Sequence, residues 1–168
     1  KRLGRSLGTL GGGNHFIEID EAADGTKYLI IHSGSRNLGK QVAEHYQKLA
    51  VDLDRGYGEY FEKREEIIKT YKEQGRRGEI QEALKELRRK FHESEAGMPE
   101  DLCFLSGKYL AEYLHDVEVC QAYARRNREK MAEIILERTG LAGGEAFHTI
   151  HNYIDTEEMI LRKGAIAA

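Results

Sequence analysis

The sequence predicts an α+β fold, with β-type segments near both ends of the chain and helical periodicity between them. Residues 14–20 and 27–32 combine β-branched and aromatic side chains with short alternating or continuous apolar runs, which is typical of strands. From residue 37 to about residue 138 the apolar side chains recur at helical spacing. β-type runs return at residues 146–151 and 159–161. We therefore expect a β-hairpin and β-sheet core flanked by long α-helices.

The first two strands are expected to form a hairpin. Residues 14–20 alternate between two faces, one of which carries Ile17 and Ile19, and residues 27–32 are continuously apolar at their centre. Asp24-Gly25-Thr26 between them is a turn signal, because Gly tolerates the backbone angles that a tight turn requires. The spacing leaves no room for a helix between the two strands.

Two long helices are expected in the middle of the chain. One begins at Asn37, where the apolar stripe starts, and is interrupted at Gly56. The other follows Pro99, the only proline, and runs from about Gly107 to Arg138 before a group of glycines ends it.

Residues 59–95 are expected to form a charged helical hairpin that protrudes from the core. Two amphipathic patterns lie in this segment, separated by Gly75 and Gly78, and together they carry ten acidic and ten basic side chains. The alternative is a basic arm that grips RNA. We favour solvated helix faces with pairs of opposite charge, because the acids balance the bases.

Composition excludes several classes of protein. The chain has 168 residues, 40% of them hydrophobic, which suffices for one domain with a real core and excludes disorder. Its formal net charge of −3 provides no general basic field, so a polyanion would have to be held locally. No apolar run reaches the ~18–20 residues that span a bilayer, and no signal peptide is recognisable. We expect a soluble, cytoplasmic protein whose Cys103 and Cys120 are reduced and buried.

The densest chemical signal is a glycine-rich segment at residues 8–18, Gly-Thr-Leu-Gly-Gly-Gly-Asn-His-Phe-Ile-Glu. Consecutive glycines allow an anion or a nucleotide to approach the peptide N–H groups. The segment is neither a P-loop nor a dinucleotide fingerprint, because no Gly-Lys-Ser/Thr follows and a strand rather than a helix comes next. A flexible turn is the alternative. Asn14, His15 and Glu18 at the exit of the turn favour a binding site.

The second signal is His32-Ser33-Gly34-Ser35-Arg36, which connects a strand to a helix. Free N–H groups at a helix start, together with a guanidinium, are suited to bind a phosphate, so Ser33, Ser35 and Arg36 are candidate RNA or phosphate contacts. In the alternative interpretation His32 is a packed strand residue and Ser35 is only a helix cap.

The third signal is His148-Thr149-Ile150-His151-Asn152. On a strand, residues three apart point to opposite faces, so we select His151 and not His148 as a ligand. Together His15, His32 and His151 would suit Zn, Mn, Fe or Ni, and spacing alone does not choose between these metals. A local basic run at residues 125–128 is either a solvated helix face or an RNA phosphate contact.

These motifs resemble the middle of the RtcB-type RNA-splicing ligases. The resemblance rests on five blocks in the order of the family and spans nearly the whole chain. They are the glycine-rich segment 8–18, the segment 32–36 with Leu38-Gly39, Asp116 with Ala122, Ala124 and Asn127-Arg128, the pair His151-Asn152, and Arg162-Lys163-Gly164-Ala165.

The resemblance implies cofactors, a pocket and a reaction. Two Mn²⁺ ions would be bound by an Asp and a Cys upstream and by His15, His32 and His151. A histidine would be guanylylated by GTP, GMP would pass to an RNA 3′-phosphate or 2′,3′-cyclic phosphate end, and a 5′-hydroxyl would displace it, in tRNA splicing or RNA repair. The guanylate pocket would be lined by Asn14, His15, Phe16, Ile17, Glu18, His151 and Asn152.

The departures from the family pattern define what this chain lacks. The upstream Asp and Cys ligands, the downstream nucleophilic histidine and a terminal lysine are absent, so we expect residues 1–168 to be the central part of one catalytic domain and inactive alone. Asn37 stands where the family usually has glycine. Two alternatives remain: a non-catalytic metal- or RNA-binding module, and a metal-dependent phosphoesterase, for which Glu18 is the only obvious general base.

Overall fold

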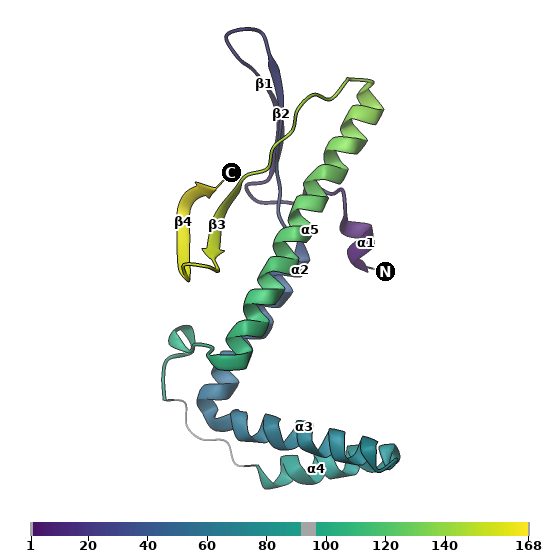
Figure 1. The fold of residues 1–168 in the computed structure, drawn as a ribbon, viewed down its shortest axis with the longest axis vertical. Helices are drawn as coiled ribbons and strands as arrows, with labels where there is room; N and C mark the ends of the chain where they lie inside the picture. The colour runs from purple at the N-terminus through teal and green to yellow at the C-terminus, as the bar shows by residue number, and fades with distance from the viewer. Residues whose placement is uncertain (1, 92–96, 168) are drawn as a thin grey trace. The chain divides into compact units, whose positions relative to one another are not determined.

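The computed structural model describes residues 2–91 and 97–167, and it contains both helices and strands (Figure 1). In chain order the elements are α1 (Arg2–Ser6), β1 (Phe16–Glu21), β2 (Lys27–His32), α2 (Asn37–Asp52), the π-helical turn η1 (Leu53–Tyr57), α3 (Gly58–Glu73), the 3₁₀ turn η2 (Arg77–Glu79), α4 (Ile80–Lys90), the 3₁₀ turn η3 (Glu100–Leu102), α5 (Gly107–Thr139), β3 (Ile150–Asp155) and β4 (Ile160–Ala167). The predicted mixture of helix and sheet is confirmed.

Strands β1 and β2 form the predicted antiparallel hairpin. Glu21 pairs with Lys27 beside the turn, and Phe16 pairs with His32 at the open end. The Asp24 carboxylate accepts a hydrogen bond of 2.9 Å from the N–H of Thr26 and fixes the turn. All six side chains of β1 are exposed, so this hairpin is not the buried sheet core that the sequence predicts.

Strands β3 and β4 form a second, separate two-stranded sheet. The sequence predicts a strand over residues 146–151, but β3 begins only at Ile150 and runs to Asp155, so this prediction is wrong for residues 146–149. A strand needs a partner for its peptide groups, and the pairing with β4 begins at Ile150 opposite Ala167. His148 therefore lies outside the strand, and the alternation argument does not apply to it.

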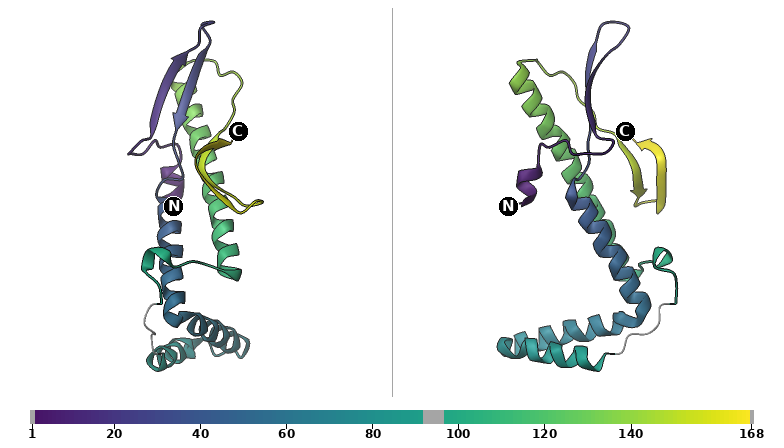
Figure 2. Two further views of the ribbon diagram at one scale, coloured as in Figure 1. Left: turned by 90° about the vertical axis from the view of Figure 1, so that its left-hand side faces the viewer. Right: turned by 180° about the vertical axis from the view of Figure 1, so that it is seen from behind.

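The charged segment forms the predicted helical hairpin. Helix α2 ends at Asp52, and the predicted interruption at Gly56 lies inside η1, where Gly56 has φ 85°. Helices α3 and α4 pack side by side in every view (Figures 1 and 2). An aromatic cluster joins them, in which the rings of Tyr57 and Phe91 lie 4.3 Å apart and Arg88 stacks on Tyr57. Exposed ion pairs such as Lys63 with Glu59 line the helix faces. Residues 92–95 of the predicted hairpin lie outside the described residues.

Helix α5 is 33 residues long and agrees with the predicted span. Its buried side chains are Cys120, Asn127 and Met131, which recur at helical spacing on one face. Cys120 is buried as expected, whereas Cys103 is only half-buried because it lies after the short η3 turn, with its Sγ 3.6 Å from the Pro99 carbonyl oxygen.

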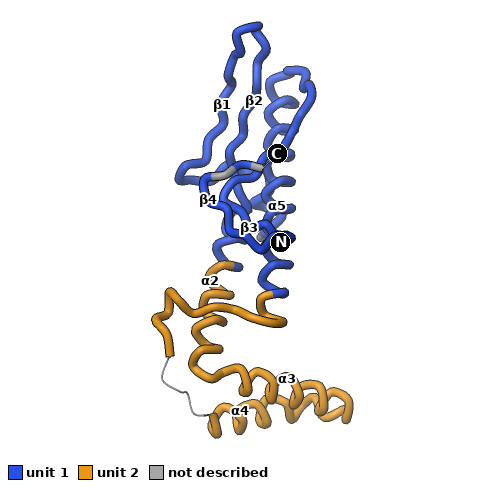
Figure 3. The backbone as a smooth tube through the Cα atoms, turned by 60° about the vertical axis from the view of Figure 1, so that its left-hand side comes forward, with its two compact units in different colours: residues 1–42, 111–168 blue, residues 43–110 orange. Residues whose placement is uncertain are grey.

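The chain divides into two compact units, coloured separately in Figure 3. Unit 1 consists of Lys1–Val42 and Ala111–Ala168, and it contains both hairpins and most of α5. Unit 2, Ala43–Leu110, contains α3 and α4, and its buried apolar side chains come from α2. Within residues 2–91 and 97–167, no helix is both long and apolar enough to cross a membrane.

The turn between α3 and α4 gives a test of backbone conformation alone. Gly75 has φ 72° and Gly78 does not have a positive φ, while a Cβ at either position meets no atom within 4 Å. We expect Gly75→Ala to lower the free energy of unfolding by about 1 kcal/mol, because L residues are strained in the left-handed region. Gly78→Ala should leave it unchanged within about 0.5 kcal/mol. Urea unfolding followed by circular dichroism measures both, and equal effects would contradict the assignment.

Candidate functional site

The three histidines selected from the sequence lie together in unit 1. His15 immediately precedes β1, His32 ends β2 and His151 lies in β3. The ring centroids of His15 and His32 are 6.0 Å apart, and those of His32 and His151 are 5.1 Å apart. The ring of Phe16 lies 5.1 Å from that of His32. Side chains far apart in the sequence thus form one cluster, which we call the histidine cluster.

Hairpin register places His15 beside His32. Phe16 is paired with His32, so the residue before β1 and the last residue of β2 meet at the open end of the hairpin. His151 reaches the cluster from a strand with a β-bulge, because the pairing of β3 with β4 shifts between His151 and Tyr153. At the bulge Asn152 has φ 54°, and its Oδ1 accepts a 2.7 Å hydrogen bond from the N–H of Gly164.

The hydrogen bonds of His15 define which of its ring nitrogens is free. Nδ1 lies 2.9 Å from the Leu10 carbonyl oxygen, and a carbonyl only accepts, so Nδ1 carries the proton. Nη1 of Arg36 lies 3.4 Å from the same nitrogen, and since a guanidinium only donates, that contact would need the opposite tautomer. The shorter bond decides between them. Nε2 is therefore the nitrogen with a free lone pair.

His32 is held in its neutral form. Partial burial lowers the pKa of its imidazole, and the nearby His151, His15 and Arg128 lower it further, because each disfavours a second positive charge. A neutral imidazole is the form that binds a metal ion. The lowered pKa of His32 thus favours binding of a metal cation over protonation of its imidazole.

The glycine-rich loop lies against Arg36. A Cβ at Gly11 would meet the Arg36 guanidinium, the end of a flexible side chain, and the φ of 95° at Gly11 would strain any other residue there. Arg36 itself has φ 59°, and its Nε donates to Thr9 Oγ1 at 3.2 Å. The guanidinium is thus held beside both the loop and His15, where the predicted phosphate contact would require it.

The other predicted contact residues differ in accessibility. Ser33 is 7% exposed, and its Oγ donates to the Leu10 carbonyl oxygen at 2.9 Å, which argues against a phosphate contact for Ser33. Ser35 is half-buried where the chain enters α2. Asn14, Phe16, Ile17, Glu18, His151 and Asn152 are exposed, and His15 and His32 are half-buried.

Sequence reasoning did not assign a site role to Asn127, which the structure places at the centre of this region. Its side chain has no exposed surface, and its amide bonds to both the glycine-rich loop and the Ser33-Gly34 segment. The sequence feature that could have indicated its burial is its position four residues before Met131, on the helix face of α5 that also carries Cys120. A polar residue in that register needs buried partners.

The basic run at residues 125–128 divides into two kinds of side chain. Arg125 and Arg126 are exposed and pair with Glu129 at 3.1 and 3.3 Å, which favours the solvated helix face. Arg128 points inward, where its Nη1 donates to the Ser33 carbonyl oxygen at 3.1 Å, and burial lowers its pKa. The run is therefore not a free cationic patch.

The chemistry of the histidine cluster fits a divalent transition-metal ion, but the chain supplies only part of a ligand set. Neutral imidazoles with a fixed tautomer are ordinary ligands for Mn, Fe, Ni or Zn. Among the described residues, no three His, Cys, Asp or Glu side chains are arranged to hold one ion by themselves. Anionic ligands from outside this chain would have to complete such a site.

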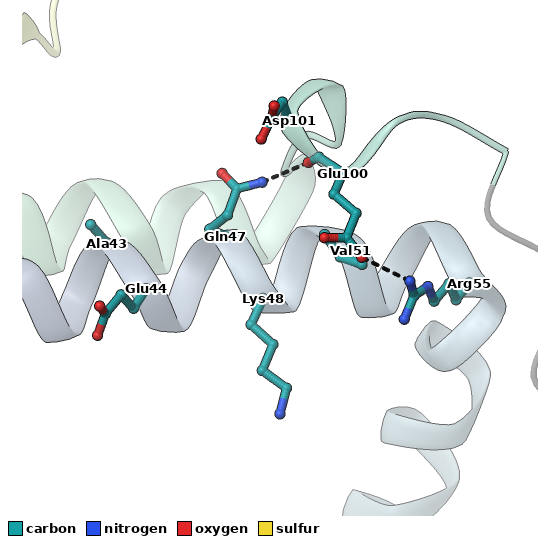
Figure 4. Close-up of a pocket in the computed structure, with 8 residues that line it drawn as sticks. All are labelled: Ala43, Glu44, Gln47, Lys48, Val51, Arg55, Glu100 and Asp101. Atoms are coloured by element: carbon teal, nitrogen blue, oxygen red, sulfur yellow. Dashed lines mark hydrogen bonds and ion pairs between the residues drawn. The ribbon is translucent and has the colours of Figure 1, made fainter.

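Unit 2 contains an open pocket of about 560 Å³ that shares no residue with the histidine cluster (Figure 4). Its walls are joined by hydrogen bonds: Gln47 Nε2 donates to the Glu100 carbonyl oxygen at 2.7 Å, and Arg55 pairs with the Glu100 carboxylate at 2.9 Å. The pocket is lined by Ala43, Glu44, Gln47, Lys48, Val51, Arg55, Glu100 and Asp101. Its charges are mixed, so it favours neither an anion nor a cation.

His148 gives a test of the electrostatics beside the cluster. Burial lowers its pKa below 6.5, and Arg125 and Arg128 lower it further, which outweighs Glu129 at 3.4 Å from Nε2. We expect Arg125→Gln to raise the pKa of His148, because the variant removes a nearby cation and one of the two ion pairs that Glu129 forms with arginine. NMR titration of the imidazole measures the midpoint. Arg138→Gln, on the same helix, should not move it, and an unchanged midpoint in Arg125→Gln would contradict this account.

Comparison with known proteins identifies relatives of the chain. The family model described as tRNA-splicing ligase RtcB matches residues 1–168. The RNA-splicing ligase RtcB of Escherichia coli (strain K12) is 27% identical over 183 aligned residues, which cover 98% of this chain and 36% of that protein. The tRNA-splicing ligase RtcB of Thermococcus kodakarensis is 38% identical over 66 residues, which cover 31% of this chain and 14% of that protein. The tRNA-splicing ligase RtcB of Aeropyrum pernix is 39% identical over 72 residues, which cover 34% of this chain and 15% of that protein. No solved structure matches the chain.

The extent of these matches decides what they establish. The chain spans about a third of the length of its Escherichia coli relative, 36%, so the relative's activity does not transfer to it directly. The family model, in contrast, matches the whole of the chain, including all five sequence blocks on which the resemblance rests. The chain belongs to the RtcB family.

Proposed function

We propose that the intact protein is a GTP- and Mn²⁺-dependent RNA ligase that joins a 3′-phosphate or 2′,3′-cyclic phosphate end to a 5′-hydroxyl end. Family membership and relatives named RNA-splicing ligases support an RNA ligase. The structural observation that carries the proposal is the convergence of the His15, His32 and His151 rings beside a glycine-rich loop.

The histidine cluster would bind the metal ions. His15 would contribute Nε2, since its Nδ1 is bonded to Leu10, and His32 and His151 would each contribute a ring nitrogen. An Asp and a Cys from the upstream part of the intact protein would complete the set for two ions. When bound, Mn²⁺ supplies neutralisation of phosphoryl charge.

The strand that follows the glycine-rich loop would bind the guanylate. Asn14, Phe16, Ile17 and Glu18 lie within three residues of His15 in the chain and are exposed, so a nucleotide can reach them. The carboxylate of Glu18 can accept the N–H donors of the guanine edge, which adenine does not present in the same pattern. His151 and Asn152 would line the opposite side of the pocket.

Arg36 would bind phosphate oxygens of GTP or of the RNA end. In the first step a histidine outside this chain attacks the α-phosphorus of GTP and pyrophosphate leaves. Water would first open a 2′,3′-cyclic phosphate end to a 3′-phosphate with a free 2′-hydroxyl. In the second step the RNA 3′-phosphate takes the guanylyl group from that histidine. In the third step the 5′-hydroxyl attacks the activated phosphorus, a phosphodiester forms and GMP leaves. The Arg36 guanidinium, which lies beside Gly11, would orient charged oxygens through these steps.

Radiolabelled GTP provides the direct test of the reaction class. The intact protein, incubated with Mn²⁺ and α-labelled GTP, should form a covalent protein–GMP adduct and then ligate RNA with matching ends. Release of inorganic phosphate without an adduct would favour a phosphoesterase. Binding of RNA or metal without either product would favour a non-catalytic module.

Removal of a histidine of the cluster should abolish adduct formation. We expect His15→Ala, His32→Ala and His151→Ala to reduce adduct formation at least about 100-fold, while circular dichroism shows the fold retained, because each residue is at most half-buried. His115→Ala, an exposed histidine on α5, is the matched control and should behave as wild type. Near wild-type adduct formation in any cluster variant would assign that histidine a structural role.

Glu18 should determine nucleotide preference and not metal content. We expect Glu18→Ala to retain Mn²⁺ but to bind GTP about ten- to a hundredfold more weakly, since loss of a charged hydrogen-bond partner costs roughly 1.5–3 kcal/mol. Its preference for GTP over ATP in adduct formation should fall accordingly. Asp20→Ala, also exposed on β1, is the control. A loss of Mn²⁺ with intact GTP preference would move Glu18 into the metal site.

A further inference from the structure

The amide of Asn127 is a link between two segments of the candidate site. Its Oδ1 accepts hydrogen bonds from the N–H groups of Gly8 and Thr9 at 2.8 and 3.1 Å. Its Nδ2 donates to the Thr9 carbonyl oxygen at 3.0 Å, to Ser33 Oγ at 3.1 Å and to the Gly34 carbonyl oxygen at 3.4 Å. A primary amide has two N–H groups and two lone pairs, so its three acceptors share the two N–H groups and its capacity is fully used.

The bonds of Asn127 lead by short paths to two members of the histidine cluster. Ser33 follows His32 directly, and Ser33 Oγ donates to the Leu10 carbonyl oxygen at 2.9 Å. The same oxygen accepts the Nδ1–H of His15 at 2.9 Å. The ring orientation of His15 and the position of the chain after His32 therefore depend on one carbonyl group.

Packing alone does not account for an asparagine at this position. Asn127 has no exposed surface and lies on the same helix face as Cys120 and Met131, where an apolar side chain would favour helix formation and burial. An apolar residue, however, would leave the peptide groups of Gly8 and Thr9 without their partner. The amide thus supplies geometry that an apolar residue cannot.

We propose that Asn127 is a positioning residue: it fixes the glycine-rich loop to the Ser33-Gly34 segment so that His15 and His32 face the same metal and nucleotide site. The inference rests on the proposed function. Asn127 touches neither substrate nor metal in this account, and it acts through Leu10, Ser33 and His15. Loss of its donors should alter catalysis and metal binding more than it alters the fold.

The decisive variant is Asn127→Asp in the intact protein. The carboxylate keeps the size of the side chain and can still accept from Gly8 and Thr9, but it cannot donate to Thr9, Ser33 or Gly34. We expect about tenfold or greater loss of Mn²⁺ affinity by calorimetry and about tenfold or greater loss of kcat for adduct formation, with little change in KM for GTP.

A readout without metal or turnover separates positioning from activity. Proton–nitrogen NMR of the metal-free protein should show His15 of the wild type as the Nδ1–H tautomer, and Asn127→Asp should shift it toward the Nε2–H form. Because Asn127→Asp removes buried hydrogen bonds and so lowers thermal stability, Ser33→Ala provides a milder break in the same path and should move each readout in the same direction. Cys120→Ser, about two turns earlier on the buried face of α5, is the control for destabilisation alone.

The outcomes separate this inference from the proposed function. Absence of a GMP adduct in the wild type would refute the proposed function, while the tautomer of His15 would still decide the role of Asn127. An unchanged tautomer, Mn²⁺ affinity and kcat in Asn127→Asp would overturn the inference. So would equal losses of kcat and metal affinity in Cys120→Ser at a temperature where both variants are folded.

Discussion

A glycine-rich loop that is partly covered by other segments has peptide groups with no regular secondary structure in which to pair. In unit 1 the side chain of Asn127 meets that requirement by acting as a substitute peptide group: it accepts from the N–H of Thr9 and donates to the carbonyl oxygen of the same residue. This is the pairing that a neighbouring strand would offer. The rest of the region depends on it, because the loop, the end of β2 and α5 meet at this one amide.

Two arginines determine the electrostatic environment of the same region. Arg128 is turned inward to the Ser33 carbonyl oxygen, and Arg36 lies on the glycine-rich loop, so two cations flank three imidazoles. Partial burial and Arg128 lower the pKa of His32, and the Arg36 guanidinium on the glycine-rich loop would attract an anion such as a phosphate. On α5, the exposed Arg125 and Arg126 pair with Glu129 and Glu133.

Local sequence patterns correctly predict those elements that depend on contacts between residues close in sequence. The turn Asp24-Gly25-Thr26 predicts the β1–β2 hairpin, and apolar periodicity predicts the span of α5, because both depend on nearby residues. The predicted start of β3 at residue 146 is wrong. The strand extends only as far as its pairing with β4, and residues 146–149 by themselves do not show where that pairing begins. The roles of His15, His32 and His151 came from the family resemblance, and their convergence depends on register and on a bulge.

The buried position of Asn127 does not follow from local sequence patterns. A polar residue within a helix usually faces solvent, and only the buried partners in the loops reveal that this one faces inward. Asn152 is similar: nothing local predicts its left-handed backbone, which follows from the bulge and from its bond to Gly164. Tertiary contacts determine both the burial of Asn127 and the backbone conformation of Asn152.

The order of the three histidines along the chain has a consequence for how the cluster assembles. The β1–β2 hairpin joins His15 and His32 through contacts between residues close in sequence, which form early and fast. Residue 127 and then His151 lie more than 90 residues further along the chain, so they leave the ribosome later. A nascent chain that ends before β3 thus holds two of the imidazoles and no third. If the proposed function holds, a metal ion would meet all three imidazoles only after α5 and β3 have been synthesised.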